Sequence, residues 1–164
     1  MITTVSDCLT FQKCPYAWWI QAVAKRKPKQ VDDSPLAFGT KVHAELAAYF
    51  NGPTSDIDGD KPLLYSLDEQ GKHNLRRIHM GTKGGRVIEL ALSTDVGGHT
   101  IYCRPDMLAQ KLYSTLYTEY QWKTTSAKKM HYTEYVRISP YSAVYNKAAK
   151  ELYGQANVNR SMEV

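Results

Sequence analysis

The sequence predicts an α+β domain in which helices pack on a mainly antiparallel sheet. Two observations support this prediction. Apolar residues recur at helical spacing through most of residues 1–83, whereas they alternate with a period of two from Gly84 onward. Helical spacing then returns over residues 139–154. We expect a single domain over residues 1–164, with a mainly helical first half, a strand meander over residues 84–126 and a closing helix.

The first two predicted helices are short. "SDCLTFQK" has a start signal in Ser6, and "CPYAWWIQAVAKRKPK" begins a second helix with Pro15 in its first turn. Tyr16, Trp19 and Val23 then fall at helical spacing. This stripe predicts a face turned toward the core, and we assign no ligand role to Trp18 or Trp19.

A third helix has clear limits, with Ser34 as its cap, Pro35 at its first position and a stop at Asn51-Gly52-Pro53. At about 100° per residue, one face is formed by Leu36, Gly39, His43, Leu46, Ala47 and Phe50. His43 is therefore expected to point into the apolar stripe. An exposed acidic loop over residues 53–62 and a helix over residues 66–81 should follow.

The strand region begins with a hairpin signal, because "RVIELALSTDVGGHTIYCRPDMLAQ" alternates on both sides of Gly97-Gly98. "LYSTLYTEYQWKTT" predicts a third strand. Along it Tyr120 and Trp122 face one way, and the opposite face carries Glu119, Gln121 and Lys123.

The closing helix is predicted from "ISPYSAVYNKAAKELYG", between a cap at Ser139 and a stop at Gly154. Its expected apolar face consists of Tyr141, Val144, Tyr145, Ala148 and Leu152. "QANVNRSMEV" is compatible with a final edge strand.

Composition narrows the functional classes. The chain has 21 Lys and Arg against 16 Asp and Glu, a net charge of +5, which suits a polyanionic partner such as DNA. No apolar run reaches the ~20 residues of a membrane span and no signal sequence is evident, so we expect a cytoplasmic protein without a membrane partner. Cys8, Cys14 and Cys103 form no CxxC pair and are expected to be buried thiols.

Several polar residues are predicted to point inward together. A hydrolase that cuts phosphodiesters with Mg²⁺ needs converging oxygen ligands and a cation near the scissile phosphate. An acid at the end of one strand, beside an acid-x-Lys unit on the next, supplies this arrangement. The candidates in this chain are His43, Glu89, Asp106, Glu119, Gln121 and Lys123.

These residues carry a resemblance to a known family. The chain resembles the RecB-like and CRISPR-adaptation branch of the PD-(D/E)XK nuclease superfamily in the order of five sequence segments. These segments are "SDCLTFQKCPYAWW", "LAFGTKVHAEL", "VIELAL", "RPDMLA" and "QWKTTS". The resemblance covers residues 6–126, and the closing helix is similar as well. It implies a restriction-endonuclease-like core and a DNA nuclease, an exonuclease in particular, that uses Mg²⁺ or Mn²⁺.

The resemblance also implies roles for single residues. His43 and Asp106 match metal ligands, and the backbone carbonyl of Trp122 matches a further one. Glu89 matches an accessory acid of the first strand. Lys123 matches the lysine that orients water and stabilises charge on the phosphate.

Gln121 departs from the family pattern, since it stands at the second carboxylate position. Its amide still offers one oxygen to a metal but lacks the negative charge. Three explanations are open: a natural, weakened enzyme, replacement of this role by Glu119, or an exchange of Glu for Gln that traps substrate without cutting it.

The closing helix departs from the pattern too. Tyr145 fits a family tyrosine that contacts DNA, but Tyr141 stands where the family has Gln. Of the cysteines that bind an iron–sulfur cluster in some relatives, Cys14 alone has a counterpart, so no cluster is expected. Further candidate DNA contacts are Lys25, Arg26, Lys128 and Lys129.

The sequence therefore supports a metal-dependent DNA nuclease as the first hypothesis. The alternative is a catalytically inactive protein that binds DNA or sequesters a partner on the same fold, and a third option is a small structural or inhibitory protein. A phage or mobile element fits a stand-alone nuclease by analogy. Both a homo-oligomer and a recombination- or CRISPR-type protein partner are compatible with the sequence.

Overall fold

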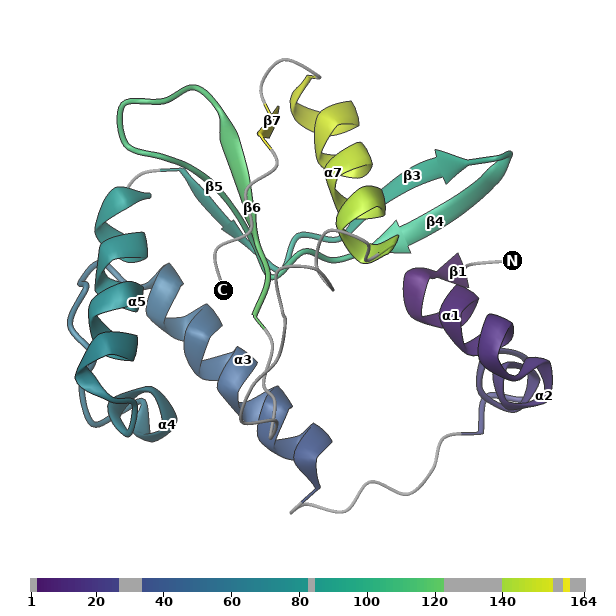
Figure 1. Cartoon of the computed structure of the whole chain (residues 1–164), viewed down its shortest axis with the longest axis horizontal. Coiled ribbons are helices and arrows are strands. Elements are labelled where there is room, and N and C mark those ends of the chain that lie inside the picture. Colours follow the sequence, from purple (N-terminus) through teal and green to yellow (C-terminus); the bar gives the residue numbers. More distant parts are fainter. Residues whose placement is uncertain (1–2, 27–33, 83–84, 123–139, 155–157, 160–164) are drawn as a thin grey trace.

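The computed structural model describes residues 3–26, 34–82, 85–122, 140–154 and 158–159, and in them the chain is a mixed α+β protein with two small sheets (Figure 1). One sheet has the strand order β1-β4-β3, and the other has the order β2-β5-β6-β7. The elements in chain order are β1 (Thr3–Thr4), α1 (Val5–Lys13), α2 (Pro15–Trp18), the π-helix η1 (Trp19–Val23), α3 (Pro35–Asn51), α4 (Pro62–Tyr65), α5 (Glu69–Gly81), β2 (Arg86–Ile88), β3 (Leu92–Val96), β4 (His99–Cys103), β5 (Met107–Gln110), β6 (Tyr117–Tyr120), α7 (Pro140–Tyr153) and β7 (Val158–Asn159).

Helix limits follow local capping chemistry. The prediction for α3 is confirmed, because the Ser34 hydroxyl accepts the Ala37 amide at 3.1 Å and Gly52 follows the last turn. The predicted cap of α1 is wrong. Thr4 rather than Ser6 caps this helix, since Asp7 stands three residues after Thr4 and the two side chains accept each other's backbone amides.

The predicted hairpin forms, but both of its strands are interrupted. Gly97 and Gly98 have φ values of 60° and 78°, which suit the tight turn that pairs Val96 with His99. Residues 89–91 and 104–106 break the ladders, so β2 and β5 join one sheet while β3 and β4 join the other. The third strand, β6, pairs antiparallel with β5, as the meander requires.

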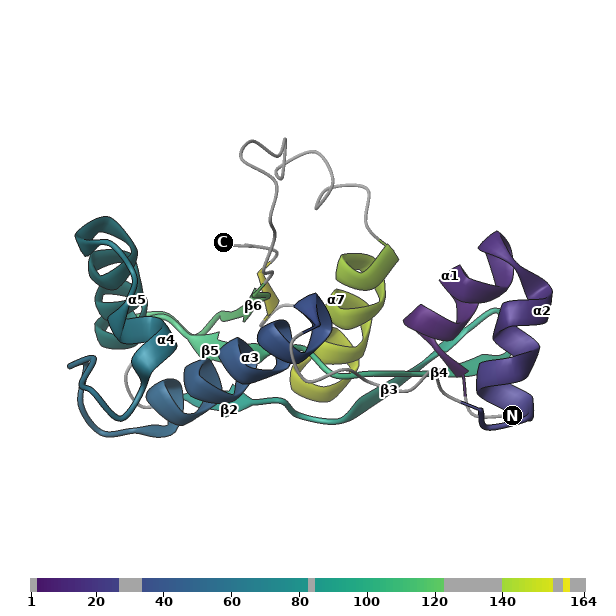
Figure 2. The ribbon, with the colours of Figure 1, turned by 90° about the horizontal axis from the view of Figure 1, so that it is seen from below.

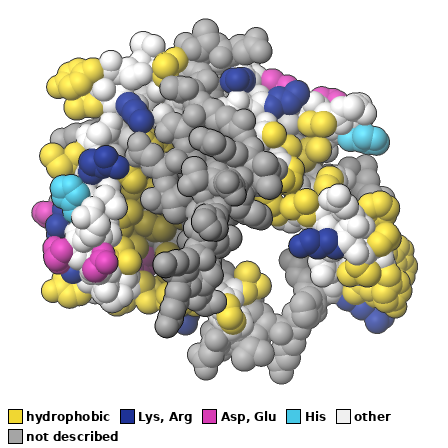
Figure 3. Space-filling model, viewed as in Figure 1, with side chains coloured by type: hydrophobic (Ala, Val, Ile, Leu, Met, Phe, Trp, Pro, Cys, Tyr) yellow, Lys and Arg dark blue, Asp and Glu magenta, His cyan; other side chains and the backbone are white. Residues whose placement is uncertain are grey.

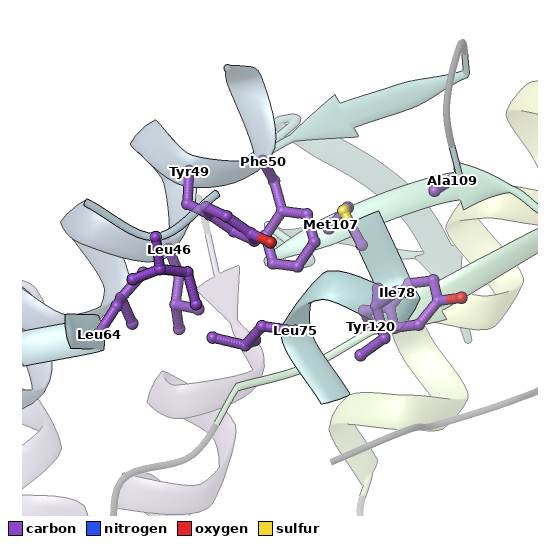
Figure 4. Close-up of a cluster of buried hydrophobic side chains, with 10 residues drawn as sticks. Leu46, Tyr49, Phe50, Leu64, Leu75, Ile78, Met107, Ala109 and Tyr120 are labelled. Carbon is purple, nitrogen blue, oxygen red and sulfur yellow. The ribbon is translucent and has the colours of Figure 1, made fainter. Parts of the chain in front are cut away.

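The main core lies between α3, α5 and one face of β5 and β6 (Figure 4). Its buried residues are Leu46, Tyr49, Phe50, Ile57, Leu64, Leu75, Ile78, Met107, Ala109 and Tyr120. A second cluster lies between α7, the adjoining ends of β3 and β4, and the opposite face of β5, and it consists of Leu92, Cys103, Leu108, Tyr145, Ala148 and Ala149. Figure 1 accordingly shows α3 and α5 on one side of β5 and β6 and α7 on the other. The predicted facing of Tyr120 and Trp122 is confirmed, since Tyr120 belongs to the main core and Trp122 packs against it.

Three predicted core positions on the N-terminal helices are wrong. Tyr16, Trp19 and Val23 are 71%, 48% and 43% exposed. Figures 1 and 2 show α1 and α2 at one end of the molecule, beside the β3–β4 hairpin and far from α5. The stripe is therefore exposed because no described element covers it.

Two end positions of predicted apolar faces are also exposed. Leu36 lies in the first turn of α3 and Leu152 in the last turn of α7, beyond the layers that cover the middle of each helix. Gly154 ends α7 as predicted with a φ of 89°, whereas the predicted cap Ser139 lies outside the described residues. The final edge strand is confirmed as β7, which runs parallel to β6. No described helix is long and apolar enough to cross a membrane.

Candidate metal centre

His43 and Asp106 come together from positions 63 residues apart in the sequence. His43 lies in the middle of α3, and Asp106 ends the interruption between β4 and β5. The His43 Nδ1 lies 3.3 Å from the Asp106 Oδ1, and their side chains are 27% and 14% exposed. The pair is therefore partly shielded but still accessible from solvent.

The second oxygen of Asp106 is held by the neighbouring strand. The Trp122 backbone amide donates a hydrogen bond of 2.6 Å to the Asp106 Oδ2. Met107 pairs with Tyr120 in the β5–β6 ladder, so extending the register by one residue places Asp106 opposite Gln121. The acid and the Gln of the predicted motif thus lie side by side on adjacent strands.

Gln121 is 4% exposed, and its Nε2 has no hydrogen-bond partner within the described part of the chain. A buried amide nitrogen normally donates hydrogen bonds, and leaving it without an acceptor costs about 1–3 kcal/mol. The Gln121 amide nitrogen is therefore a buried polar group next to Asp106 that no described residue satisfies.

Glu89 lies at the matching interruption between β2 and β3, with a φ of 49° that non-glycine residues rarely adopt. Its backbone amide donates to the Asp106 carbonyl at 3.0 Å, which ties the two interruptions together. Its side chain is 43% exposed, and its Oε2 lies 3.8 Å from the Arg104 guanidinium. Glu89 thus points outward to Arg104, unlike the inward direction expected from the sequence.

Glu119 lies on the α7 side of β6, as the alternation predicts, and is 2% exposed. Burial raises the pKa of the Cys103 thiol to about 11, and the Glu119 carboxylate adds to the rise. Burial likewise raises the pKa of Tyr145, with a further contribution from Asp106 and a smaller one from Glu119. Tyr145 on the inner face of α7 is therefore buried with Cys103 and Glu119, near Asp106.

A cavity of about 430 Å³ opens beside this group. It extends from the start of α1, past the end of β4, to α7, and its polar lining includes Ser6, Tyr102, Arg104 and Tyr141. Arg104 was not singled out in the sequence. The sequence signal that could have identified Arg104 is its position directly before Pro105-Asp106. Arg104 brings a positive charge to the lining of the cavity, next to the candidate site.

Other predicted site residues lie elsewhere. Lys123, Lys128 and Lys129 fall outside the described residues. Lys25 and Arg26 are exposed at the end of η1.

The residues present fit a divalent ion in part. An octahedral Mg²⁺ with ligands at ~2.1 Å holds neighbouring ligands about 3 Å apart, so the His43–Asp106 separation suits two adjacent ligands. The same separation suits an ordinary hydrogen bond from the imidazole to the carboxylate. Among the described residues, no group of three His, Cys, Asp or Glu side chains gathers closely enough to hold a metal. The described residues therefore supply two adjacent candidate ligands, His43 and Asp106, but not a complete metal site.

The three cysteines should react at different rates. Cys8 and Cys14 are exposed and Cys103 is buried, which makes the expectation of three buried thiols wrong for two of them. Because only the thiolate is nucleophilic, the raised pKa and burial of Cys103 should suppress its reaction with a disulfide reagent at about pH 8. We expect two thiols to react rapidly in the native protein and the third only in denaturant. Equal rates for all three would contradict this placement of Cys103.

Comparisons of the chain with protein-family models, with curated proteins and with solved structures gave no match.

Proposed function

We propose that the chain is a metal-dependent DNA nuclease built on a restriction-endonuclease-like core, with β2-β5-β6-β7, α3 and α7 as that core. The observation that carries the proposal is the meeting of the His43 imidazole and the Asp106 carboxylate at 3.3 Å. The two interrupted strands and the strained Glu89 backbone lie at the same place. Strained backbone of this kind concentrates at functional sites.

In this proposal, His43, Asp106 and the Gln121 side-chain oxygen hold Mg²⁺ or Mn²⁺. The bound ion would polarise a phosphate oxygen and lower the pKa of a bound water. The Trp122 amide fixes the Asp106 carboxylate, so the ligand is oriented before substrate arrives. Lys123, one residue beyond Trp122 in the sequence, is the proposed cation for charge that develops on the phosphate.

A specific observation favours the second candidate, an inactive DNA-binding or partner-sequestering protein on the same fold. Gln121 supplies a neutral amide where the motif has a carboxylate, so a divalent cation would lack one compensating negative charge. The net charge of +5 remains suitable for DNA whether or not the site cuts.

Restoring the carboxylate separates the two candidates. We expect Gln121→Glu to cleave DNA in the presence of Mg²⁺ or Mn²⁺ at a rate well above that of the unchanged chain. The reason is the added negative charge opposite Asp106, at a position that the β5–β6 register places on the neighbouring strand. Gel assays on labelled single-stranded and duplex DNA, with and without EDTA, provide the measurement. Binding without cleavage by either protein would reject the nuclease and leave the inactive binding protein.

A further inference from the structure

The N-terminal helices present aromatic side chains to solvent. Tyr16, Trp19 and Val23 form a stripe along α2 and η1, and Phe11 on α1 is 51% exposed. Phe11 also packs edge-on against Trp18, with ring centroids 5.2 Å apart. Figure 3 shows hydrophobic side chains gathered over these helices at the lower right of the view. Exposed apolar patches on monomeric proteins commonly mark binding sites.

The same helices are positively charged. Over residues 3–26 the cations are Lys13, Lys25 and Arg26, all exposed, whereas Asp7 is the one acid. Asp7 accepts the backbone amide and hydroxyl of Thr4 in the helix cap, so its charge is already engaged. Figure 3 shows Lys and Arg side chains at the border of the hydrophobic patch. Aromatic rings beside cations therefore define this surface.

We propose that this surface binds single-stranded DNA, with bases stacking on the aromatic rings and phosphates contacting the cations. The proposal rests on the proposed function for the choice of DNA as ligand. The N-terminal aromatic surface, as we name it, comprises Phe11, Tyr16, Trp19, Val23, Lys25 and Arg26.

Three features favour this ligand over duplex DNA or a protein. The most exposed apolar side chains of this surface are aromatic, and planar rings stack on bases whose faces are free, as they are in a single strand. Their positive surroundings match a polyanion better than an apolar protein surface. The stripe also includes the π-helix η1, a conformation that occurs frequently at functional sites.

The surface is separate from the candidate metal centre. It lies on α1, α2 and η1, at the end of the molecule that also holds the β3–β4 hairpin, whereas His43 lies on α3 (Figures 1 and 2). It would therefore hold a strand away from the bond that is cut. Its loss should weaken binding without removing the metal ligands.

The test measures the anisotropy of a fluorescein-labelled single strand and of the matching duplex, with EDTA present so that no cleavage occurs. We expect Trp19→Ala or Tyr16→Ala to weaken single-strand binding about tenfold and to leave duplex binding almost unchanged. Trp19→Phe should retain most of the affinity, because a ring remains. The control is Tyr113→Ala, since Tyr113 is 99% exposed and lies in the β5–β6 loop. Tyr16 is so exposed that its loss should leave the fold intact, which circular dichroism checks.

Salt dependence tests the cations separately. Lys25→Ala should reduce the slope of log affinity against log salt concentration by about 1 and lower the affinity for every sequence alike. Equal losses for single strand and duplex, an unchanged affinity in Trp19→Ala, or no single-strand binding by the unchanged chain would overturn the proposal. So would a dimer in sedimentation that Trp19→Ala dissociates, because a second copy would then be the occupant. Since these readouts need no metal, they can succeed or fail independently of cleavage by Gln121→Glu.

Discussion

In the Gln121→Glu background, replacing Asp106 by alanine is expected to lower metal-dependent DNA cleavage by about 10³-fold. A bound metal supplies several kcal/mol of charge stabilisation in the transition state, and about 1.4 kcal/mol corresponds to a tenfold change in rate. The Asp106 carboxylate lies 3.3 Å from the His43 imidazole, so its removal takes the central ligand from the proposed site. Single-turnover cleavage of labelled DNA measures this effect, and calorimetric titration with Mn²⁺ measures metal affinity alongside it.

Two further variants separate a ligand role from a structural role. Asp106→Asn keeps an oxygen that can accept the Trp122 amide, so it should fold normally and still lose most of the cleavage and Mn²⁺ affinity. Asp60→Ala removes an exposed carboxylate of the loop before α4 and should change neither. Full Mn²⁺ binding by Asp106→Asn would remove Asp106 from the metal site and with it the basis of the nuclease proposal.

Local sequence signals predicted most of the elements because they act over a few residues. Ser34 and Pro35 start α3, Gly97-Gly98 turns the hairpin, and Gly154 ends α7. The alternation of Tyr120 and Gln121 in and beside β6 also predicted which face each side chain takes. Such signals report the conformation that a short segment adopts.

The packing of an element against its neighbours was harder to predict than the conformation of the element itself. The spacing of Tyr16, Trp19 and Val23 identifies one face of a helix but cannot tell whether another element covers that face. The interruptions of the hairpin were also missed, because Glu89 stands in a strand-like pattern and only its positive φ reveals the break.

Some residues of the candidate site could be predicted from the sequence, and others could not. His43 could be singled out by its place in an apolar helix stripe and Asp106 by its place at a strand end and the resemblance, and the structure brings them together. The Trp122 amide and Arg104 were missed as contacts of the site, since they depend on the β5–β6 register and on the shape of the break before β5. Whether Lys123 joins them remains a prediction.

Phe50→Ala is expected to lower the free energy of unfolding by about 3–5 kcal/mol, the range for a buried Phe replaced by Ala. Phe50 is 1% exposed and lies where α3, α5 and the end of β6 meet. Its ring stacks on Trp122 at a centroid distance of 5.2 Å and an interplanar angle of 6°, and on His79 at 5.9 Å. The Ala side chain would leave a cavity that these rings cannot close without moving.

Urea unfolding followed by tryptophan fluorescence and by circular dichroism provides the measurement, with coincident curves as the test of a two-state transition. Leu36→Ala is the matched control on the same helix. Leu36 is 71% exposed, so its loss should change stability by no more than about 0.5 kcal/mol. Equal effects of the two variants would mean that Phe50 is not buried between α3, α5 and the end of β6. His43 lies on the same face of α3, seven residues before Phe50, so a displacement of α3 that exposes Phe50 would also separate His43 from Asp106 and remove the proposed metal centre.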